Sequence, residues 1–124
     1  MVTDDRIGIV ALRGERFDGH DFVPQAIAAG AVAAVTEQPI GGCPCLVVEN
    51  TGRALLKIAR FYREKFHPVL VGVTGSVGKT STKEMIAAVL EQKFRVLKTL
   101  GNFNNELGLP LTVFRLREED EIAV

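Results

Sequence analysis

Hydrophobic and polar residues alternate along the chain in a way that predicts short strands and amphipathic helices. The apolar, β-branched segment 7–12 is followed by a polar loop and predicts a strand. Asp21 then precedes a short helical stretch that ends at Gly30, so we expect Asp21 to cap a helix and Gly30 to close it. Segments 31–36 and 45–49 predict two more strands, joined by a turn-rich stretch. The first part of the chain is therefore expected to be a β-α-β-β unit.

A longer helix is predicted over residues 52–66, where apolar residues recur at helical spacing and most charged residues fall outside the stripe. The stripe consists of Leu55, Ile58, Ala59, Tyr62 and Phe66. His67 and Pro68 break the pattern, because proline cannot continue a helix and disfavours helical backbone in the residue before it. We therefore expect one domain in residues 1–67 and another in residues 68–124.

The second half of the chain repeats the alternation of strands and helices. The predicted strands are 69–73, 95–99 and the apolar triplet 122–124, which has the pattern of the first half of a strand. Another segment follows at residues 109–117. Between the first two strands, a helix is predicted that ends at about residue 94. The apolar face of that helix is expected to contain Met85, Ile86, Val89 and Leu90. Alternation of this kind favours parallel sheets, so the predicted fold class is α/β.

Composition and charge narrow the class of protein. The chain has 124 residues, of which 47% are hydrophobic and 24% charged, as in a globular protein with one ordinary domain or two incomplete ones. Fifteen basic residues balance fifteen acidic ones, so we expect no binding to nucleic acid or to an anionic membrane. With no signal peptide and no apolar run long enough to cross a bilayer, we expect no membrane insertion and a cytoplasmic location. Cys43 and Cys45 are too few for a zinc site.

The residues that follow segment 69–73 predict a phosphate-binding loop. Gly75 and Gly78 let backbone N–H groups approach phosphate oxygens, and the helix that follows adds the positive end of its dipole. Lys79 can reach the terminal phosphates of a nucleotide, and the Thr80 hydroxyl is placed to bind Mg²⁺. Lys79 is the candidate catalytic residue and Thr80 the candidate metal ligand. The candidate ATP-binding residues are Thr74, Gly75, Ser76, Val77, Gly78, Lys79, Thr80 and Ser81.

Two observations count against a phosphate site. The strict template G-x-x-x-x-G-K-[ST] requires glycine where this chain has Val73. In addition, Ser81 and Glu84 have the spacing of a helix capping box, which would make the glycines a plain turn and Lys79 a solvated surface residue. A lysine at a helix N-terminus is disfavoured unless an anion is nearby, and the preceding residues supply none. A bound anionic ligand is the simpler explanation.

Residues 74–85 resemble the ATP loop of the Mur ligases, whose version begins Thr-Gly and does not require the earlier glycine. Two further stretches, 14–22 and 101–110, look like segments of the branch of this family that joins D-alanyl-D-alanine to a UDP-N-acetylmuramoyl tripeptide. The resemblance spans nearly the whole chain. It implies that residues 1–67 are a small domain that binds the UDP substrate, and that residues 68–124 are the opening portion of a central, mostly parallel ATP-binding domain.

The resemblance also implies a reaction. ATP would phosphorylate the peptide carboxylate of UDP-N-acetylmuramoyl-peptide, and the amine of D-alanyl-D-alanine would attack the acyl phosphate, with ATP and Mg²⁺ as cofactors. Such a ligase would act in peptidoglycan precursor synthesis. The family's later metal-binding glutamate and its third domain lie beyond this sequence, so we expect the chain as given not to turn over. Its oligomeric state stays open.

Candidate substrate-binding residues come from three places in the chain. By the resemblance, Asp18, Gly19 and His20 would contact the uridine or diphosphate, with His20 as a donor; alternatively, they form a plain turn. Asn104 and Asn105, like Asn102, follow a predicted strand, at the edge where open α/β sheets bind ligands, although asparagines also stabilise turns. Arg6 is a further candidate, although the family has a longer spacer after it.

Two other functions remain open at this stage. An unrelated phosphate-loop kinase or GTPase would also carry such a loop, although the chain has no Asn-Lys-x-Asp guanine signature. A folded nucleotide-binding fragment without activity of its own is the second alternative.

Overall fold

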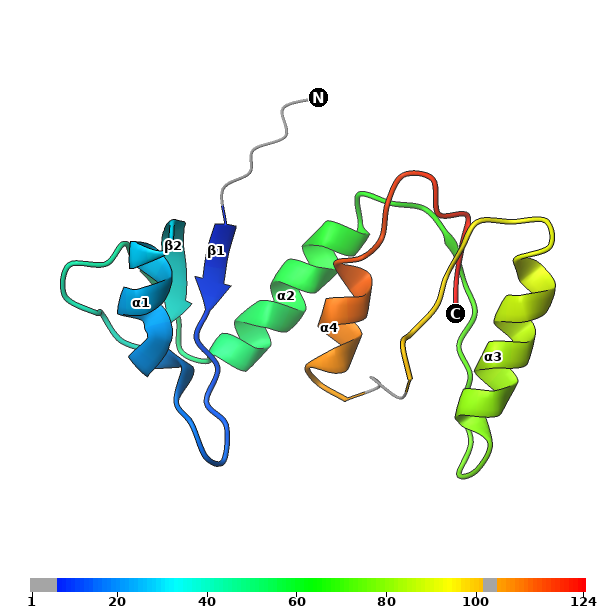
Figure 1. Cartoon of the computed structure of the whole chain (residues 1–124), viewed down its shortest axis with the longest axis horizontal. Coiled ribbons are helices and arrows are strands. Elements are labelled where there is room, and N and C mark those ends of the chain that lie inside the picture. Colours follow the sequence, from blue (N-terminus) through cyan, green and yellow to red (C-terminus); the bar gives the residue numbers. More distant parts are fainter. Residues whose placement is uncertain (1–6, 102–104) are drawn as a thin grey trace. The chain divides into compact units, whose positions relative to one another are not determined.

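The computed structural model describes residues 7–101 and 105–124, which form two compact units (Figure 1). The first unit ends at Leu55, and the second runs from Leu56 to Val124. The helix α2 (Thr51–Arg63) contains the point of division. The assignment of residues 1–67 and 68–124 to two domains stays a prediction.

The first unit contains a three-stranded parallel sheet. Its strands are β1 (Ile7–Val10), β2 (Ala31–Thr36) and β3 (Cys45–Val47), in the order β1-β2-β3. The helix α1 (Val23–Ala28) connects the first two strands. All three strands lie where the hydrophobic pattern predicts them, β2 with the predicted bounds and β1 and β3 with shorter ends. The parallel sheet confirms the α/β fold class.

The start of α1 differs from the prediction. A 3-10 turn, η1 (Gly19–Phe22), precedes the helix, and α1 has no side-chain cap at its first residue, so the prediction that Asp21 caps it is wrong. Asp18 instead caps the turn by accepting a hydrogen bond of 3.0 Å from the backbone N–H of His20. The additional turn moves the capping position three residues upstream. Gly30 has a φ of 110°, which confirms that it closes the helix.

Small apolar residues form the core of the first unit. Ala11, Val23 and Ala34 are buried, at 1% exposure or less. Five partly buried residues pack against them, namely Ile9, Ile27, Ile40, Cys43 and Cys45. Both cysteines are free thiols, and their packing against this core gives them a structural role.

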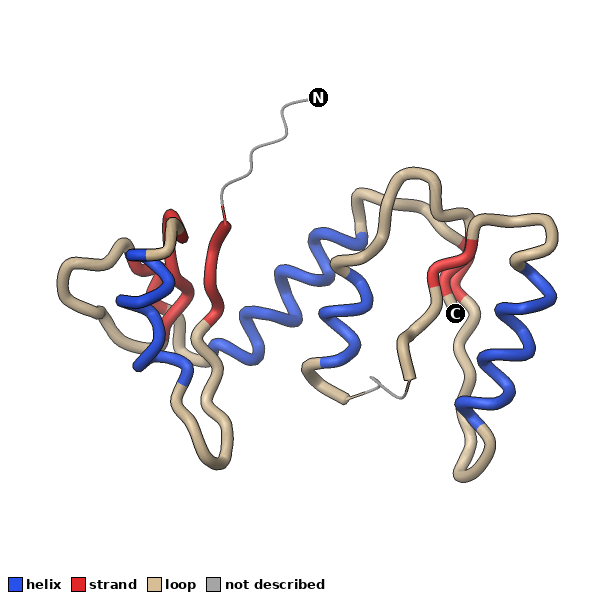
Figure 2. Tube along the Cα trace, viewed as in Figure 1, coloured by secondary structure: helices blue, strands red, loops and turns tan. Residues whose placement is uncertain are grey.

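The second unit contains a second parallel sheet of three short strands, which Figure 2 shows lying together. The strand order is β4-β6-β5, so the last strand in the sequence is the central one. The elements of this unit after α2 are β4 (Val69–Leu70), α3 (Lys79–Leu90), β5 (Val96–Leu97), α4 (Gly108–Val113) and β6 (Ile122–Ala123). The apolar triplet at 122–124 therefore does contribute a strand.

The predicted apolar faces of the two long helices are only partly buried. In α2, Leu55 and Ala59 are buried, whereas Ile58 is 39% exposed. In α3 the prediction is wrong for Met85 and Val89, which are 64% and 72% exposed. The buried residues of α3 are Lys83 and Ala87, four positions apart and so on one face of the helix. The small side chain of Ala87 permits close packing. Lys83 can be buried because its ammonium donates hydrogen bonds to backbone oxygens.

An aromatic cluster joins α2 to the segment after α4 within the second unit. The Tyr62 ring lies 5.0 Å from the Phe66 ring and 5.6 Å from the Phe114 ring, measured between centroids. The Tyr62 hydroxyl donates a hydrogen bond of 3.0 Å to the backbone oxygen of Leu116. In the described part of the chain, no helix is long and apolar enough to cross a membrane.

Candidate functional site: a phosphate loop at the start of a helix

The loop between β4 and α3 presents backbone donors at the start of a long helix. Gly75 and Gly78 have φ angles of 150° and 79°, a region that favours glycine over residues with side chains. Gly78 is the N-cap of α3 and offers no side-chain hydrogen bond to the first turn. The N–H groups at the start of α3 therefore have no side-chain cap and can bind an anion.

The side chain of Lys79 lies over this loop. The residue is half-buried, and its ammonium group donates a hydrogen bond to the backbone oxygen of Gly75. That acceptor belongs to the loop itself, so the ammonium is held against the loop backbone. Since an ammonium has three N–H donors, it can bond phosphate oxygens as well.

The other predicted nucleotide-binding residues surround this position. They are Thr74, Ser76 and Val77 in the loop and Thr80 and Ser81 in the first turn of α3, and all of them are exposed. The side chain of Val77 points to solvent, at 90% exposure, so Val77 can contribute only through its backbone. Thr80 follows Lys79 in the first turn of α3, and its role as a magnesium ligand stays a prediction.

The structure contradicts the capping box. The helix α3 begins at Lys79, so Ser81 lies within its first turn and is not the N-cap. The carboxylate of Glu84 bonds elsewhere, with one oxygen 2.7 Å from the ammonium of Lys98 and the other 3.2 Å from that of Lys83. The hydrogen bond from Lys98, and then that from Lys83, lowers the pKa of Glu84. Glu84 therefore satisfies cations and caps no helix.

A cavity of about 220 Å³ opens beside the loop. Residues from α3, from α4 and from the segments that follow β4, β5 and β6 line it: Val71, Gly72, Val73, Lys79, Thr80, Lys83, Thr99, Gly101, Leu109 and Val124. The structure therefore brings the candidate catalytic residue and the candidate metal ligand to one cavity. Our sequence interpretation missed Lys83, although its position four residues after Lys79 places both on the same helix face.

Of the candidates in the asparagine-rich stretch, the structure describes Asn105. Its side-chain oxygen accepts a hydrogen bond of 2.6 Å from the backbone N–H of Gly108, at the start of α4. This contact gives Asn105 the structural role that asparagine commonly takes in turns. Asn102 and Asn104 lie outside the described residues, as does Arg6. Their substrate contacts stay predictions.

In the first unit, His20 is buried and fully bonded. It is 5% exposed, and its Nδ1 lies 2.6 Å from an oxygen of Asp18. Its Nε2 accepts a hydrogen bond of 2.9 Å from the backbone N–H of Glu37. Because Nε2 is an acceptor, the proton of a neutral ring is on Nδ1, where it is donated to Asp18. In this arrangement His20 has no ring N–H to offer a ligand, contrary to the donor role expected from the sequence.

The neighbours of His20 also bond to one another. Arg13 lies between two carboxylates, with its Nε 3.4 Å from an oxygen of Asp18 and 3.3 Å from one of Glu37. The pKa of Asp18 is lowered, chiefly by its hydrogen bond from the His20 backbone and then by that from the His20 ring. These contacts favour a structural role for the loop. A substrate contact by Asp18, Gly19 or His20 stays a prediction.

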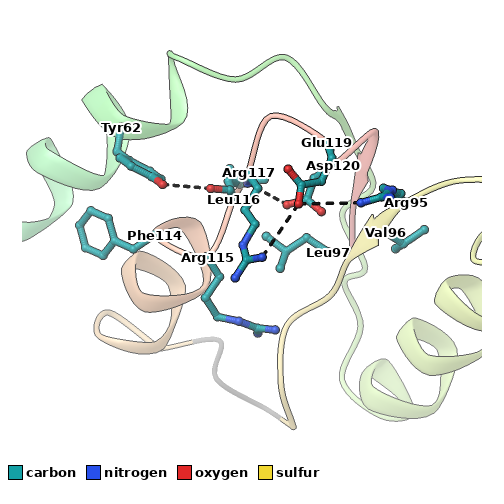
Figure 3. Close-up of a pocket in the computed structure, with 10 residues that line it drawn as sticks. All are labelled: Tyr62, Arg95, Val96, Leu97, Phe114, Arg115, Leu116, Arg117, Glu119 and Asp120. Atoms are coloured by element: carbon teal, nitrogen blue, oxygen red, sulfur yellow. Dashed lines mark hydrogen bonds and ion pairs between the residues drawn. The ribbon is translucent and has the colours of Figure 1, made fainter. Parts of the chain in front are cut away.

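A second and larger cavity, of about 650 Å³, lies in the second unit and contains none of the residues singled out as site candidates (Figure 3). Arg95 and Arg117 lie on either side of Glu119, with guanidinium nitrogens 3.8 Å and 3.9 Å from the same carboxylate oxygen. All three side chains are largely exposed. Such exposed ion pairs are weak, so this cavity carries no assignment.

The chain is similar in sequence and in fold to known Mur ligases. Residues 73–124 match the Mur ligase middle domain. A UDP-N-acetylmuramoyl-tripeptide–D-alanyl-D-alanine ligase from Synechocystis is 50% identical to the chain over 119 residues. The similarity to these ligases thus extends over nearly the whole chain. A relative from Bacillus subtilis with the same name is 48% identical, and each alignment covers 93% of this chain and 26% of the relative.

Solved Mur ligase structures have the same fold. The D-alanyl-D-alanyl ligase from Acinetobacter baumannii superposes with a TM-score of 0.87 at 42% identity, over 94% of this chain and 27% of that one. A MurF ligase from Thermotoga maritima, solved in complex with ADP, superposes with a TM-score of 0.86 at 43% identity, over 96% of this chain and 29% of that one. The chain thus spans about a quarter of the length of these relatives.

Proposed function

We propose that this chain supplies the nucleotide loop and part of the substrate site of an ATP-dependent Mur ligase. The ligase would join D-alanyl-D-alanine to UDP-N-acetylmuramoyl-tripeptide through an acyl phosphate. One observation carries the proposal: a loop without a side-chain cap places Lys79 at the start of α3. The chain that contains this loop is 50% identical, over 119 residues, to a ligase of that name. Residues 1–67 would bind the UDP substrate, and residues 68–124 would bind ATP. A cytoplasmic location is part of the same proposal.

The residues of the loop fit the chemistry of phosphoryl transfer. In such a reaction, negative charge develops on the transferred phosphoryl group, and fixed donors stabilise it without reorganising. The uncapped N–H groups at the start of α3 and the Lys79 ammonium are donors of this kind. Thr80 would hold Mg²⁺ by its hydroxyl, with phosphate oxygens and water as further ligands, because Mg²⁺ prefers oxygen ligands in octahedral geometry.

Nucleotide binding is tested first, by calorimetry of the 124-residue chain with ATP and Mg²⁺. Replacing Lys79 with alanine removes the ammonium but leaves the loop backbone. We expect Lys79→Ala to bind ATP at least about tenfold more weakly than the wild type, a loss typical of a charge-assisted contact. Lys57→Ala is the matched control, since Lys57 is an exposed lysine of α2. Equal affinities for the wild type and Lys79→Ala would refute the assignment of the loop.

Ligase activity is tested in a chimera. The chain replaces the matching quarter of the Bacillus subtilis relative, and mass spectrometry follows the product formed from UDP-N-acetylmuramoyl-tripeptide, D-alanyl-D-alanine and ATP. We expect product that requires both substrates, and none when the chimera carries Lys79→Ala. A folded chimera that binds ATP but forms no product would contradict the ligase proposal while leaving nucleotide binding intact.

A further inference from the structure

Lys83 is a buried cation on the phosphate-loop helix. It is 7% exposed, although a lysine is almost never buried without a partner, because an unpaired ammonium loses its hydration without compensation. Its ammonium donates hydrogen bonds to the backbone oxygens of Thr99 and Gly101, the second of them at 2.7 Å. An oxygen of Glu84 lies 3.2 Å away. These three acceptors match the three N–H donors of a lysine ammonium.

The two lysines of this helix face are therefore in different situations. Lys79 bonds only within its own loop among the contacts of the described residues, and it keeps donors for a ligand. Lys83 has given its donors to the protein, so it cannot also bond a phosphate oxygen without losing a contact. Apart from the attraction of its charge, any effect of Lys83 on a bound nucleotide passes through the residues that it holds.

Lys83 connects two walls of the same cavity. One wall is the first turn of α3, with Lys79 and Thr80, and the other is the backbone that leaves the carboxyl end of β5, with Thr99 and Gly101. The second wall also bonds to the residue after the central strand β6, since the backbone N–H of Thr99 donates to the oxygen of Val124 at 2.9 Å. The Lys83 ammonium therefore connects α3 to the backbone that follows β5.

We propose that Lys83 is a positioning residue of the nucleotide site, whose buried ammonium holds the backbone at 99–101 against α3 and so fixes the cavity that faces Lys79 and Thr80. The proposal rests on the proposed nucleotide-binding function. Without the ammonium, the oxygens of Thr99 and Gly101 lose their partner, and the wall moves relative to the phosphate loop. Small displacements of this kind weaken binding even when every ligand-contacting group is present.

The first test replaces Lys83 with methionine, which has a similar length but no charge. Calorimetry with ATP and Mg²⁺ is expected to show about tenfold weaker binding to the folded variant, although Lys79 is intact. Ala87→Gly is the matched control, because it weakens the same helix one turn further on and leaves the ammonium contacts unchanged. It should lower the melting temperature but keep the wild-type affinity. The proposal is overturned if folded Lys83→Met binds as the wild type does, or if both variants lose affinity equally.

The second test needs no variant. In the wild type, NMR should show the ammonium protons of Lys83 exchanging with water much more slowly than those of exposed Lys57. Equal exchange rates would overturn the proposal even if Lys83→Met fails to fold. The proposed function is tested separately, by comparing the ATP affinities of the wild type and Lys79→Ala. If those two bind ATP equally, the phosphate site is refuted, whereas the exchange rates still report whether Lys83 is held.

Discussion

At the scale of single residues, the partners of a polar side chain decide whether it can serve a ligand. The sequence points to both His20 and Lys79, but His20 uses both ring nitrogens within the protein, and Lys79 bonds a carbonyl of its own loop. The first arrangement fixes a turn. The second leaves donors beside a cavity, so Lys79 is the stronger candidate for function.

Gly19 is required by its close approach to a neighbouring backbone. A Cβ at this position would lie 2.6 Å from the backbone oxygen of Leu12 and 2.7 Å from its nitrogen, closer than real Cβ atoms come. We expect Gly19→Ala to lower the free energy of unfolding by about 1–3 kcal/mol, as overpacking of this kind does. Unfolding in denaturant measures this loss of free energy for Gly19→Ala against the wild type. Gly41→Ala is the control, since a Cβ added to Gly41 would meet no atom within 4 Å, and an equal loss there would contradict the explanation.

Asp18 should make the stability of the first unit depend on pH. Hydrogen bonds from His20 lower its pKa in the folded state, so the ionised carboxylate stabilises the fold above the unfolded pKa of about 3.9. This stabilisation is lost as the pH falls through the lower folded pKa. We therefore expect the stability difference between the wild type and Asp18→Asn to be largest near neutral pH and to shrink in acid. A difference that stays constant down to about pH 2.5, or equal behaviour in Asp21→Asn, would argue against it.

At the scale of elements, the start of α2 is held both locally and by another element. The side-chain oxygen of Asn50 accepts a hydrogen bond of 2.8 Å from the backbone N–H of Arg53, as a local cap does. Thr51, at the start of α2, is 2% exposed, and its backbone N–H and hydroxyl lie 3.2 Å and 3.3 Å from one oxygen of Glu37. Glu37 directly follows β2. The residue after β2 thus adds to the local cap at the start of α2.

Removing this carboxylate should destabilise the first unit. Glu37→Ala leaves two buried donors of Thr51 without their acceptor, so we expect a loss of about 1–3 kcal/mol in the free energy of unfolding. Thermal and denaturant unfolding followed by circular dichroism measure the loss. Glu49→Ala removes an exposed carboxylate from the same unit and should change stability little. Similar losses in the two variants would show that Thr51 finds another acceptor.

At the scale of the whole molecule, the chain consists of two compact units with different contents. The first unit holds the polar network around His20, and the second holds the phosphate loop, Lys79 and Lys83. If the first binds the UDP substrate and the second ATP, as we propose, each ligand can be titrated against the chain separately. Variants of Lys79 and Lys83 should then leave the first unit unchanged.

The sequence by itself determined the α/β class, the places of the strands and the glycine-bearing loop before α3. These features depend on local properties: runs of β-branched residues, a glycine that closes α1, and glycines before Lys79 at a helix start. The family resemblance also indicates Arg6 and the asparagines at 102, 104 and 105 as candidate substrate-binding residues. Of these, only Asn105 is described, and its observed contact is structural.

Only the tertiary structure decided which faces are buried and which polar groups are used. Periodicity places Met85 and Val89 on the apolar face of α3, yet the buried pair is Lys83 and Ala87. Lys83 can be buried because carbonyl groups sixteen and eighteen residues later in the chain come to it, and no local pattern records that approach. The same holds for His20, whose second partner lies seventeen residues away. A side chain's type can be read from the sequence, but its partners are known only once distant segments have met.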